Sequence, residues 1–151
     1  MVPRVRATLF HAVERKEHFS LRLHPSTVRR LVEHSRRRGV PKTSIAEQYL
    51  EEAIRIADHP GIMFREGPAG RRPALAGHRL DVWQVIETVR EEHGNVEAAA
   101  EYLNISPGLV NAAVSYYADY KEEVEAWIER NAAIAKEAQD AWRRRQAALR
   151  E

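Results

Sequence analysis

The sequence has no cysteine, which excludes disulfides, thiolate nucleophiles and cysteine-ligated zinc. It also has no apolar run near the ~20 residues that a membrane-spanning helix needs, so neither a signal peptide nor a membrane span is expected. The seven histidines show no metal-ligand spacing such as H-x-x-x-H, and no nucleophile, base and orienting acid come together. We therefore expect a soluble, cytoplasmic protein that is not an enzyme, with no catalytic residues, metal or cofactor.

Charge is distributed unevenly along the chain, although the formal net charge is only +2. Residues 1–58 hold 12 Lys and Arg against 7 Asp and Glu, residues 59–120 hold 5 against 8, and residues 121–151 hold 7 against 7. A basic segment followed by an acidic one indicates that the first part faces a polyanion and the second does not.

Periodicity and turn residues predict a mainly helical chain in which residues 1–16 form a basic, partly flexible arm. The expected helices cover Pro25 to about Gly39, Pro41–Ser44 to about Ala57, and then about 81–92, 96–103, 107–120 and 121 to near the end, with short strands at 17–23, 62–65 and 72–75. Gly39 is placed to end the first helix as a residue in the left-handed conformation can.

The stretch HFSLRLHP, His18 to Pro25, alternates apolar and polar residues. In an extended chain Phe19, Leu21 and Leu23 fall on one face, and the polar side chains of His18, Ser20 and Arg22 fall on the other. One strand and two helices in about 40 residues bury too little surface to be stable alone, and a lone strand leaves both edges unpaired. We therefore expect this segment to pair with a second copy.

This order of strand, helix and helix resembles the ribbon-helix-helix family of DNA-binding proteins, typified by the Arc and MetJ repressors. The resemblance implies that two chains pair their strands and insert the two-stranded ribbon into the major groove. His18, Ser20 and Arg22 then match the base-contacting positions. Arg22 is the strongest candidate, because a guanidinium can bind guanine O6 and N7 bidentately. The alternative is half of an ordinary hairpin with a solvated outer face.

The same resemblance implies a phosphate clamp at the start of the second helix, formed by Lys42, Thr43 and Ser44. Pro41 departs from the pattern, because it stands where the family usually has a Ser or a similar capping residue, and this shifts the clamp by a residue or two. Five arginines of the first helix are candidates for further phosphate contacts, although the resemblance places most of that helix away from the groove. They are Arg29, Arg30, Arg36, Arg37 and Arg38.

From about His59 to Ile128 the sequence resembles the bacterial domain-of-unknown-function family 433. The resemblance is carried by Gly67-Pro68, Gly77-His78-Arg79 and the segment from Ala113 to Tyr117. Within it, AAAEYLNISPGLVNAAV has the spacing of a helix-turn-helix, with Ala100 at the crossing, Asn104 in the turn and Val110 as an apolar anchor. Because this part is acidic, we favour a structural or dimerising trihelical core over a second DNA reader.

The last helix carries a narrow apolar stripe at heptad-like spacing, interrupted by Asn131 and Arg145. Trp and Arg often anchor protein interfaces, and here they fall within an otherwise highly charged segment. The candidate partner-binding residues are Trp127, Trp142, Arg143, Arg144 and Arg145. The alternative is that the tail packs on its own domain or on the second copy.

The expected fold class is mainly α, with a dimeric ribbon-helix-helix over residues 17–58, a small trihelical helix-turn-helix-like domain with a β-hairpin over 59–120, and a partner-binding helix over 121–151. The resemblances imply a VapB-type antitoxin of a type II toxin-antitoxin system, a homodimer or higher even oligomer. It would bind double-stranded operator DNA and neutralise a PIN-like ribonuclease. A transcription regulator without a toxin and a dimeric interaction scaffold remain as alternatives.

Overall fold

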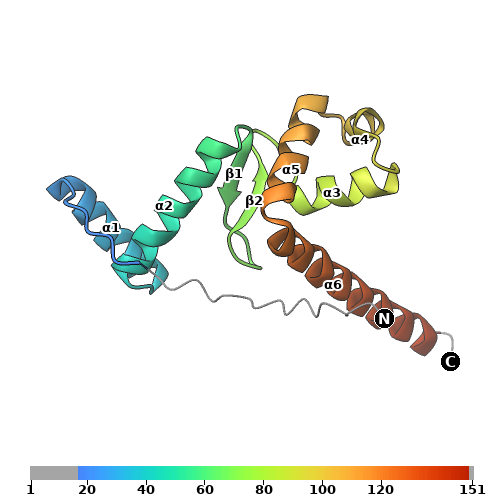
Figure 1. Ribbon diagram of the computed structural model, residues 1–151. Coiled ribbons are helices and arrows are strands. Elements are labelled where there is room, and N and C mark those ends of the chain that lie inside the picture. Colours follow the sequence, from blue (N-terminus) through green and yellow to red (C-terminus); the bar gives the residue numbers. More distant parts are fainter. Residues whose placement is uncertain (1–16, 150–151) are drawn as a thin grey trace, which may run out of the picture. The chain divides into compact units, whose positions relative to one another are not determined.

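The computed structural model describes residues 17–149, which form six helices and two strands (Figure 1). The elements are α1 (Pro25–Arg38), α2 (Lys42–Asp58), β1 (Ile62–Arg65), β2 (Arg72–Leu75), α3 (Val82–Glu91), α4 (Val96–Leu103), α5 (Pro107–Asp119) and α6 (Lys121–Ala148). The mainly helical fold is confirmed, and both hairpin strands lie at the predicted residues. The arm predicted for residues 1–16 lies outside the described residues.

The chain divides into two compact units between Lys42 and Thr43, at the first turn of α2. The first contains α1, and the second contains nearly all of α2 with every later element. The predicted domain limits at residues 58 and 120 stay a prediction. Within the second unit, α2 is tied to later elements by the ion pairs Arg55–Glu123 and Glu52–Arg71.

Both ends of α1 follow from local sequence. The His24 side chain accepts a hydrogen bond from the Ser26 amide, and Pro25 occupies the first turn, where its missing N–H costs nothing. At the other end Gly39 has φ of 63°, a left-handed conformation that a glycine adopts without a steric penalty. The prediction that Gly39 ends this helix is confirmed.

Residues 17–24 belong to neither a helix nor a strand in the single described chain. The strand expected over residues 17–23 is therefore not present in this form of the molecule. A strand is stabilised by its ladder to a neighbour, and none of residues 17–149 of the same chain pairs with this stretch. The expected partner is a second copy, so the ribbon itself stays a prediction.

Helices α3, α4 and α5 form a trihelical unit whose turns are set by side-chain caps. Asn95 caps α4 and Ser106 caps α5, and between them Asn104 takes the left-handed conformation expected of it, with φ of 53°. The helices meet the hairpin and α6 around one apolar core in which Ala100 and Val110 are buried as expected. The fully buried side chains include Ile62, Leu75, Val82, Val85, Val110, Tyr116 and Val124.

The hairpin is joined to α3 by one buried carboxylate. Strands β1 and β2 pair antiparallel with Arg65 opposite Arg72, an arrangement that places two cations side by side. Asp81, 4% exposed at the start of α3, accepts a hydrogen bond from each guanidinium at 2.5 Å and a third from the Trp83 indole at 3.2 Å. The carboxylate is thereby a counter-charge shared by both arginines, and it fixes the hairpin against α3.

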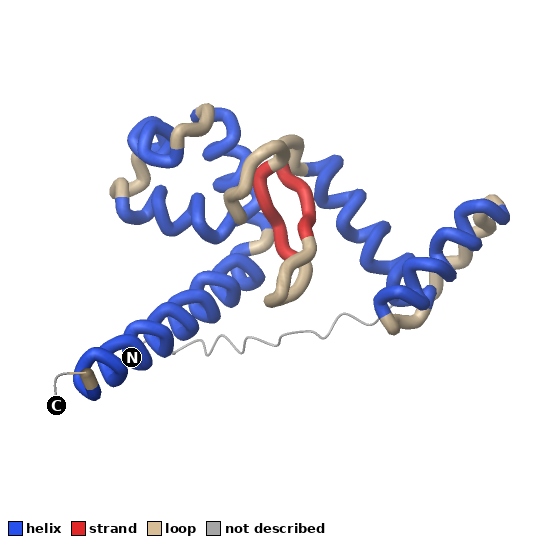
Figure 2. The backbone as a smooth tube through the Cα atoms, turned by 180° about the vertical axis from the view of Figure 1, so that it is seen from behind, coloured by secondary structure: helices blue, strands red, loops and turns tan. Residues whose placement is uncertain are grey.

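The long helix α6 begins after a break at Tyr120, whose φ of −122° separates it from α5. Val124 is fully buried and Ile128 packs against the core, but from residue 132 to the end of the helix most side chains are exposed. The second half of α6 therefore projects from the trihelical unit (Figure 2). Among the described residues no helix is long and apolar enough to span a membrane.

Candidate nucleic-acid interface

The three predicted base-contacting residues, His18, Ser20 and Arg22, share the stretch that precedes α1 and are all exposed. The residues between them are exposed too: Phe19 by 76% and Leu21 by 55%. Burying side chains of this size releases about 1.5–3 kcal/mol each relative to leaving them in water. Among residues 17–149 nothing covers the apolar face of this stretch, and its polar face is accessible.

The three predicted phosphate-contacting residues, Lys42, Thr43 and Ser44, share the first turn of α2 and are likewise exposed. Pro41 stands immediately before them, and its side chain has no oxygen with which to accept a first-turn N–H. The first turn of α2 also contains no acidic residue. A helix start with amide hydrogens, a neighbouring lysine and no local carboxylate suits an anion such as phosphate. The contact itself stays a prediction.

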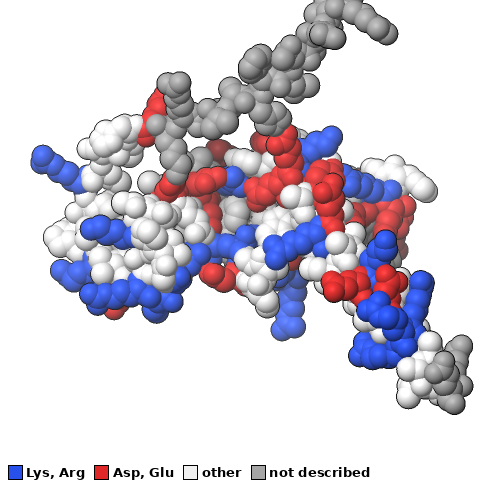
Figure 3. Space-filling view, turned by 90° about the horizontal axis from the view of Figure 1, so that it is seen from below, with Lys and Arg blue, Asp and Glu red and all other residues white. Residues whose placement is uncertain are grey.

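Lys and Arg side chains gather around α1, whereas acidic side chains are more frequent over the second unit (Figure 3). The helix contains five arginines and a single acid, Glu33. The sequence-based expectation of a basic first part is matched by the exposed positions of Arg29, Arg30, Arg36 and Arg37.

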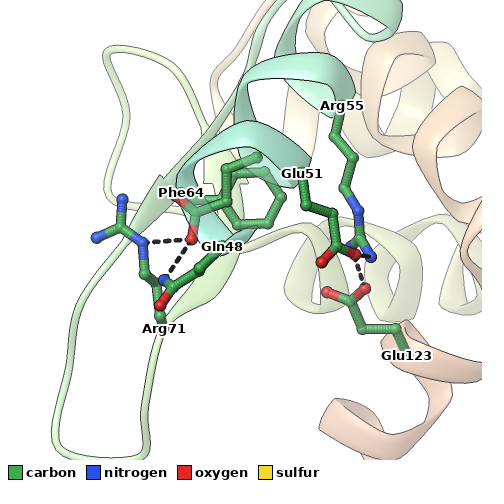
Figure 4. Close-up of a pocket in the computed structure, with 7 residues that line it drawn as sticks. Gln48, Glu51, Arg55, Phe64, Arg71 and Glu123 are labelled. Atoms are coloured by element: carbon green, nitrogen blue, oxygen red, sulfur yellow. Dashed lines mark hydrogen bonds and ion pairs between the residues drawn. The ribbon is translucent and has the colours of Figure 1, made fainter. Parts of the chain in front are cut away.

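Several arginines of the second unit, among them Arg55, Arg71 and Arg90, are engaged in ion pairs instead. A hollow of about 300 Å³ between α2, the hairpin and the start of α6 shows this most clearly (Figure 4). Arg55 donates to the Tyr116 hydroxyl at 2.9 Å and to Glu123 at 2.5 Å, and its guanidinium lies 4.1 Å from the Tyr120 ring centre. Across the hollow, Arg71 donates to Glu52 at 2.5 Å.

These contacts give the hollow a structural role. Burial acts to lower the pKa of Arg55, but the hydrogen bonds to Glu123 and Tyr116 outweigh it and raise that pKa above its ordinary value. Burial raises the pKa of the Tyr116 hydroxyl above its ordinary value, because the charged form is poorly solvated. Among residues 17–149 no three His, Asp or Glu side chains are grouped to hold a metal ion. The contacts of Arg55 with Glu123 and Tyr116 hold α2 against α6 and α5, so these side chains have a structural role.

The predicted partner-binding residues separate into two groups. Trp127 is half-buried, with Arg130 5.4 Å from its ring centre, and Arg130 also donates to the Ala69 carbonyl of the hairpin loop at 3.0 Å. Trp142 is 56% exposed on the projecting half of α6. The three arginines that follow it, Arg143, Arg144 and Arg145, are exposed as well.

No family model, curated protein or solved structure matches this chain. Arguments about function therefore depend on the residues and their positions.

The residues that sequence reasoning missed are those that join distant segments. Arg55 reaches Glu123, 68 residues away, and Asp81 joins two arginines from different strands. Only the Glu51–Arg55 pair, at i and i+4 on one helix, was visible as a local signal. The hollow and the buried carboxylate depend on tertiary packing, which no spacing in the sequence reveals.

Proposed function

We propose that this chain is a dimeric, DNA-binding antitoxin of the VapB type, which represses its own operon and neutralises a PIN-like ribonuclease. The observation that carries the proposal is the stretch before α1, where Phe19, Leu21 and Leu23 are 76%, 55% and 39% exposed at alternate positions. Three large apolar side chains at period two favour burial in a paired strand. A second copy supplies that strand with matching residues.

Pairing two copies gives the exposed polar residues their role. Each chain presents His18, Ser20 and Arg22 on the outer face of the ribbon, and the two-fold axis of the dimer requires a pair of related half-sites in the DNA. The start of α2 in each chain then binds a backbone phosphate and fixes the position of the ribbon. Binding upstream of its own gene would make the protein an autorepressor.

The second unit supports the neutralising role. Its projecting half of α6 exposes Trp142 and Leu149, by 56% and 80%, at the end of the chain opposite the ribbon segment. Aromatic and arginine side chains on an exposed helix suit a protein partner. The carboxylates that hold Mg²⁺ in a PIN-like nuclease provide a counter-charge for an inserted arginine.

The dimer is tested by sedimentation of the purified chain. At micromolar concentration we expect the mass of a dimer, or of a higher even oligomer, because the ribbon face is too apolar to remain in water. A monomer at this concentration would contradict the proposal, since one strand cannot form a ribbon.

The DNA-reading role is tested with Arg22→Ala. We expect this variant to lose about 1–3 kcal/mol of affinity for the DNA upstream of its own gene, and to lose most of its preference for that DNA over a random duplex. The matched variant Lys42→Ala should weaken binding to both duplexes alike and flatten the salt dependence, because phosphate contacts carry no sequence information. Fluorescence anisotropy at several salt concentrations measures both effects.

Equal losses of affinity for both duplexes in Arg22→Ala would refute base reading. A wild-type protein without salt-dependent DNA affinity would favour the interaction scaffold.

A further inference from the structure

The outer face of α1 carries four exposed arginines in two matched pairs. Arg29 and Arg36 are seven residues apart, and so are Arg30 and Arg37, so each pair lies nearly in line along the helix. The distance along the axis within each pair is about 10.5 Å at the standard rise. The apolar residues Val28, Leu31 and Val32 lie opposite Arg30 and Arg37, and they are flanked by Arg29 and Arg36.

Within the described residues, none of these four guanidinium groups forms an ion pair with a carboxylate, in contrast to several arginines of the second unit. There, Arg65 and Arg72 share Asp81, and Arg90 pairs with Glu125, whose pKa is lowered by the contact. The only acid on α1 is Glu33, against five arginines. The helix therefore presents an excess of positive charge directly to solvent.

Helix stability does not account for all of this charge. Cations in the last turn are favourable because they oppose the negative end of the helix dipole, and this explains Arg36, Arg37 and Arg38. Arg29 and Arg30 lie in the first half of the helix, where the dipole provides no such benefit. Glu33 lies three or four residues from each of the four arginines, so it can offset only one of their four charges. The remaining excess of positive charge favours a ligand of opposite charge.

We propose that this outer face of α1, defined by Arg29, Arg30, Arg36 and Arg37, is a second phosphate-binding surface that lies along the backbone of duplex nucleic acid. The proposal rests on the DNA-binding function above. One DNA strand carries a phosphate charge at about every 3.4 Å of helix axis, so several phosphates lie within reach of the arginines along α1. Arginine suits this contact because its planar fork binds phosphate oxygens bidentately.

A membrane surface fits this face less well. Amphipathic helices that lie on lipid bury a wide apolar face with Trp, Phe or Leu, and α1 offers only Val28, Leu31 and Val32, of which Leu31 and Val32 are already half-buried. Nucleic acid is favoured over an acidic protein because the neighbouring residues Arg22 and Lys42 are proposed to bind the same polyanion.

The test is the quadruple variant in which Arg29, Arg30, Arg36 and Arg37 are replaced by Gln in the full chain. Binding to a random-sequence duplex is measured over a range of salt concentrations. Each lost phosphate contact lowers the slope of log affinity against log salt by about 0.9, so we expect a reduction of up to about 3.6 for each chain bound. The variant should unfold close to the wild-type temperature, because Arg36 and Arg37 lose a favourable interaction with the helix dipole while repulsion along α1 is relieved.

The matched control removes four exposed cations from another helix: Lys136, Arg143, Arg144 and Arg145 are replaced by Gln on α6. Its slope should equal that of the wild type. The double variant in which only Arg29 and Arg36 are replaced by Gln should lower the salt slope by about half as much as the quadruple variant. A graded decrease of this kind indicates lost phosphate contacts, whereas a folding defect would not scale with the number of arginines removed.

An unchanged slope in the α1 variant, or an equal loss in the α6 control, overturns the inference while leaving the Arg22-dependent preference and the proposed function intact. A wild-type protein that binds no duplex overturns both. Loss of affinity for anionic lipid vesicles, or for an acidic protein, with an unchanged duplex slope would assign the face to that other partner and reject the phosphate backbone.

Discussion

Replacing Asp81 by Ala should destabilise the protein by about 3 kcal/mol, because it leaves two guanidinium groups without their shared counter-charge. The side chain of Asp81 is 6% exposed, and those of Arg65 and Arg72 are 27% and 19% exposed. Water can therefore only partly replace the hydrogen bonds that the carboxylate accepts from them. The two arginines face each other across the hairpin, so their repulsion becomes uncompensated as well. Urea unfolding followed by circular dichroism measures the change in free energy.

The control for this prediction is Asp140→Ala. Asp140 pairs with Arg143 at 3.9 Å on the exposed half of α6, and surface pairs of this kind contribute at most about 1 kcal/mol. Asp81→Asn should lie between the two, because the amide oxygen still accepts one hydrogen bond but carries no charge. If Asp81→Ala and Asp140→Ala shifted the unfolding midpoint equally, the buried carboxylate would not be the link between the hairpin and α3.

Local chemistry explains why most element boundaries could be predicted. Gly39, Asn95, Asn104 and Ser106 act on their immediate neighbours, through a left-handed conformation or a capping hydrogen bond, and each lies where its residue type suggests. The hairpin was bounded by glycines and prolines, and its strands span the residues expected. Caps and turns of this kind depend on neighbouring residues only, so they can be predicted without knowing the rest of the fold.

The stretch at residues 17–24 shows the opposite case. Its alternation of apolar and polar residues predicts a strand, but the ladder that stabilises a strand must come from elsewhere. Among the described residues of one chain there is no such partner, so Phe19, Leu21 and Leu23 remain exposed. The alternation predicts that the segment forms a strand, but a strand forms only where a second segment is available to pair with it.

The stripe along α6 was also only partly interpretable from its spacing. It runs through Val124 and Ile128 and continues to Trp142 and Leu149 without a change in period. The first two residues contact the domain core, whereas Trp142 and Leu149 are exposed. The point along α6 at which the stripe leaves the domain core depends on how far the domain extends beneath the helix. Trp127 accordingly lies within the fold, and Trp142 is the tryptophan available to a partner.

Replacing Trp142 by Ala should weaken neutralisation of the nuclease at least 30-fold, which corresponds to the loss of about 2 kcal/mol expected for a buried interface anchor. The chain alone should keep its unfolding midpoint, because Trp142 is 56% exposed and contributes little to the core. The measurement is the inhibition of RNA cleavage by the PIN-like nuclease proposed as the partner, titrated with each variant.

Three neighbouring arginines provide an internal comparison for this prediction. Arg145 lies on the apolar stripe between Trp142 and Leu149, whereas Arg143 and Arg144 lie on the outer face of the helix. A partner that covers Trp142 must also cover Arg145, and a covered guanidinium needs a carboxylate, which the nuclease site supplies. Arg145→Ala should therefore reduce inhibition strongly, and Arg143→Ala should change it little. Equal effects of the two substitutions, or full inhibition by Trp142→Ala, would show that the nuclease does not bind along this stripe.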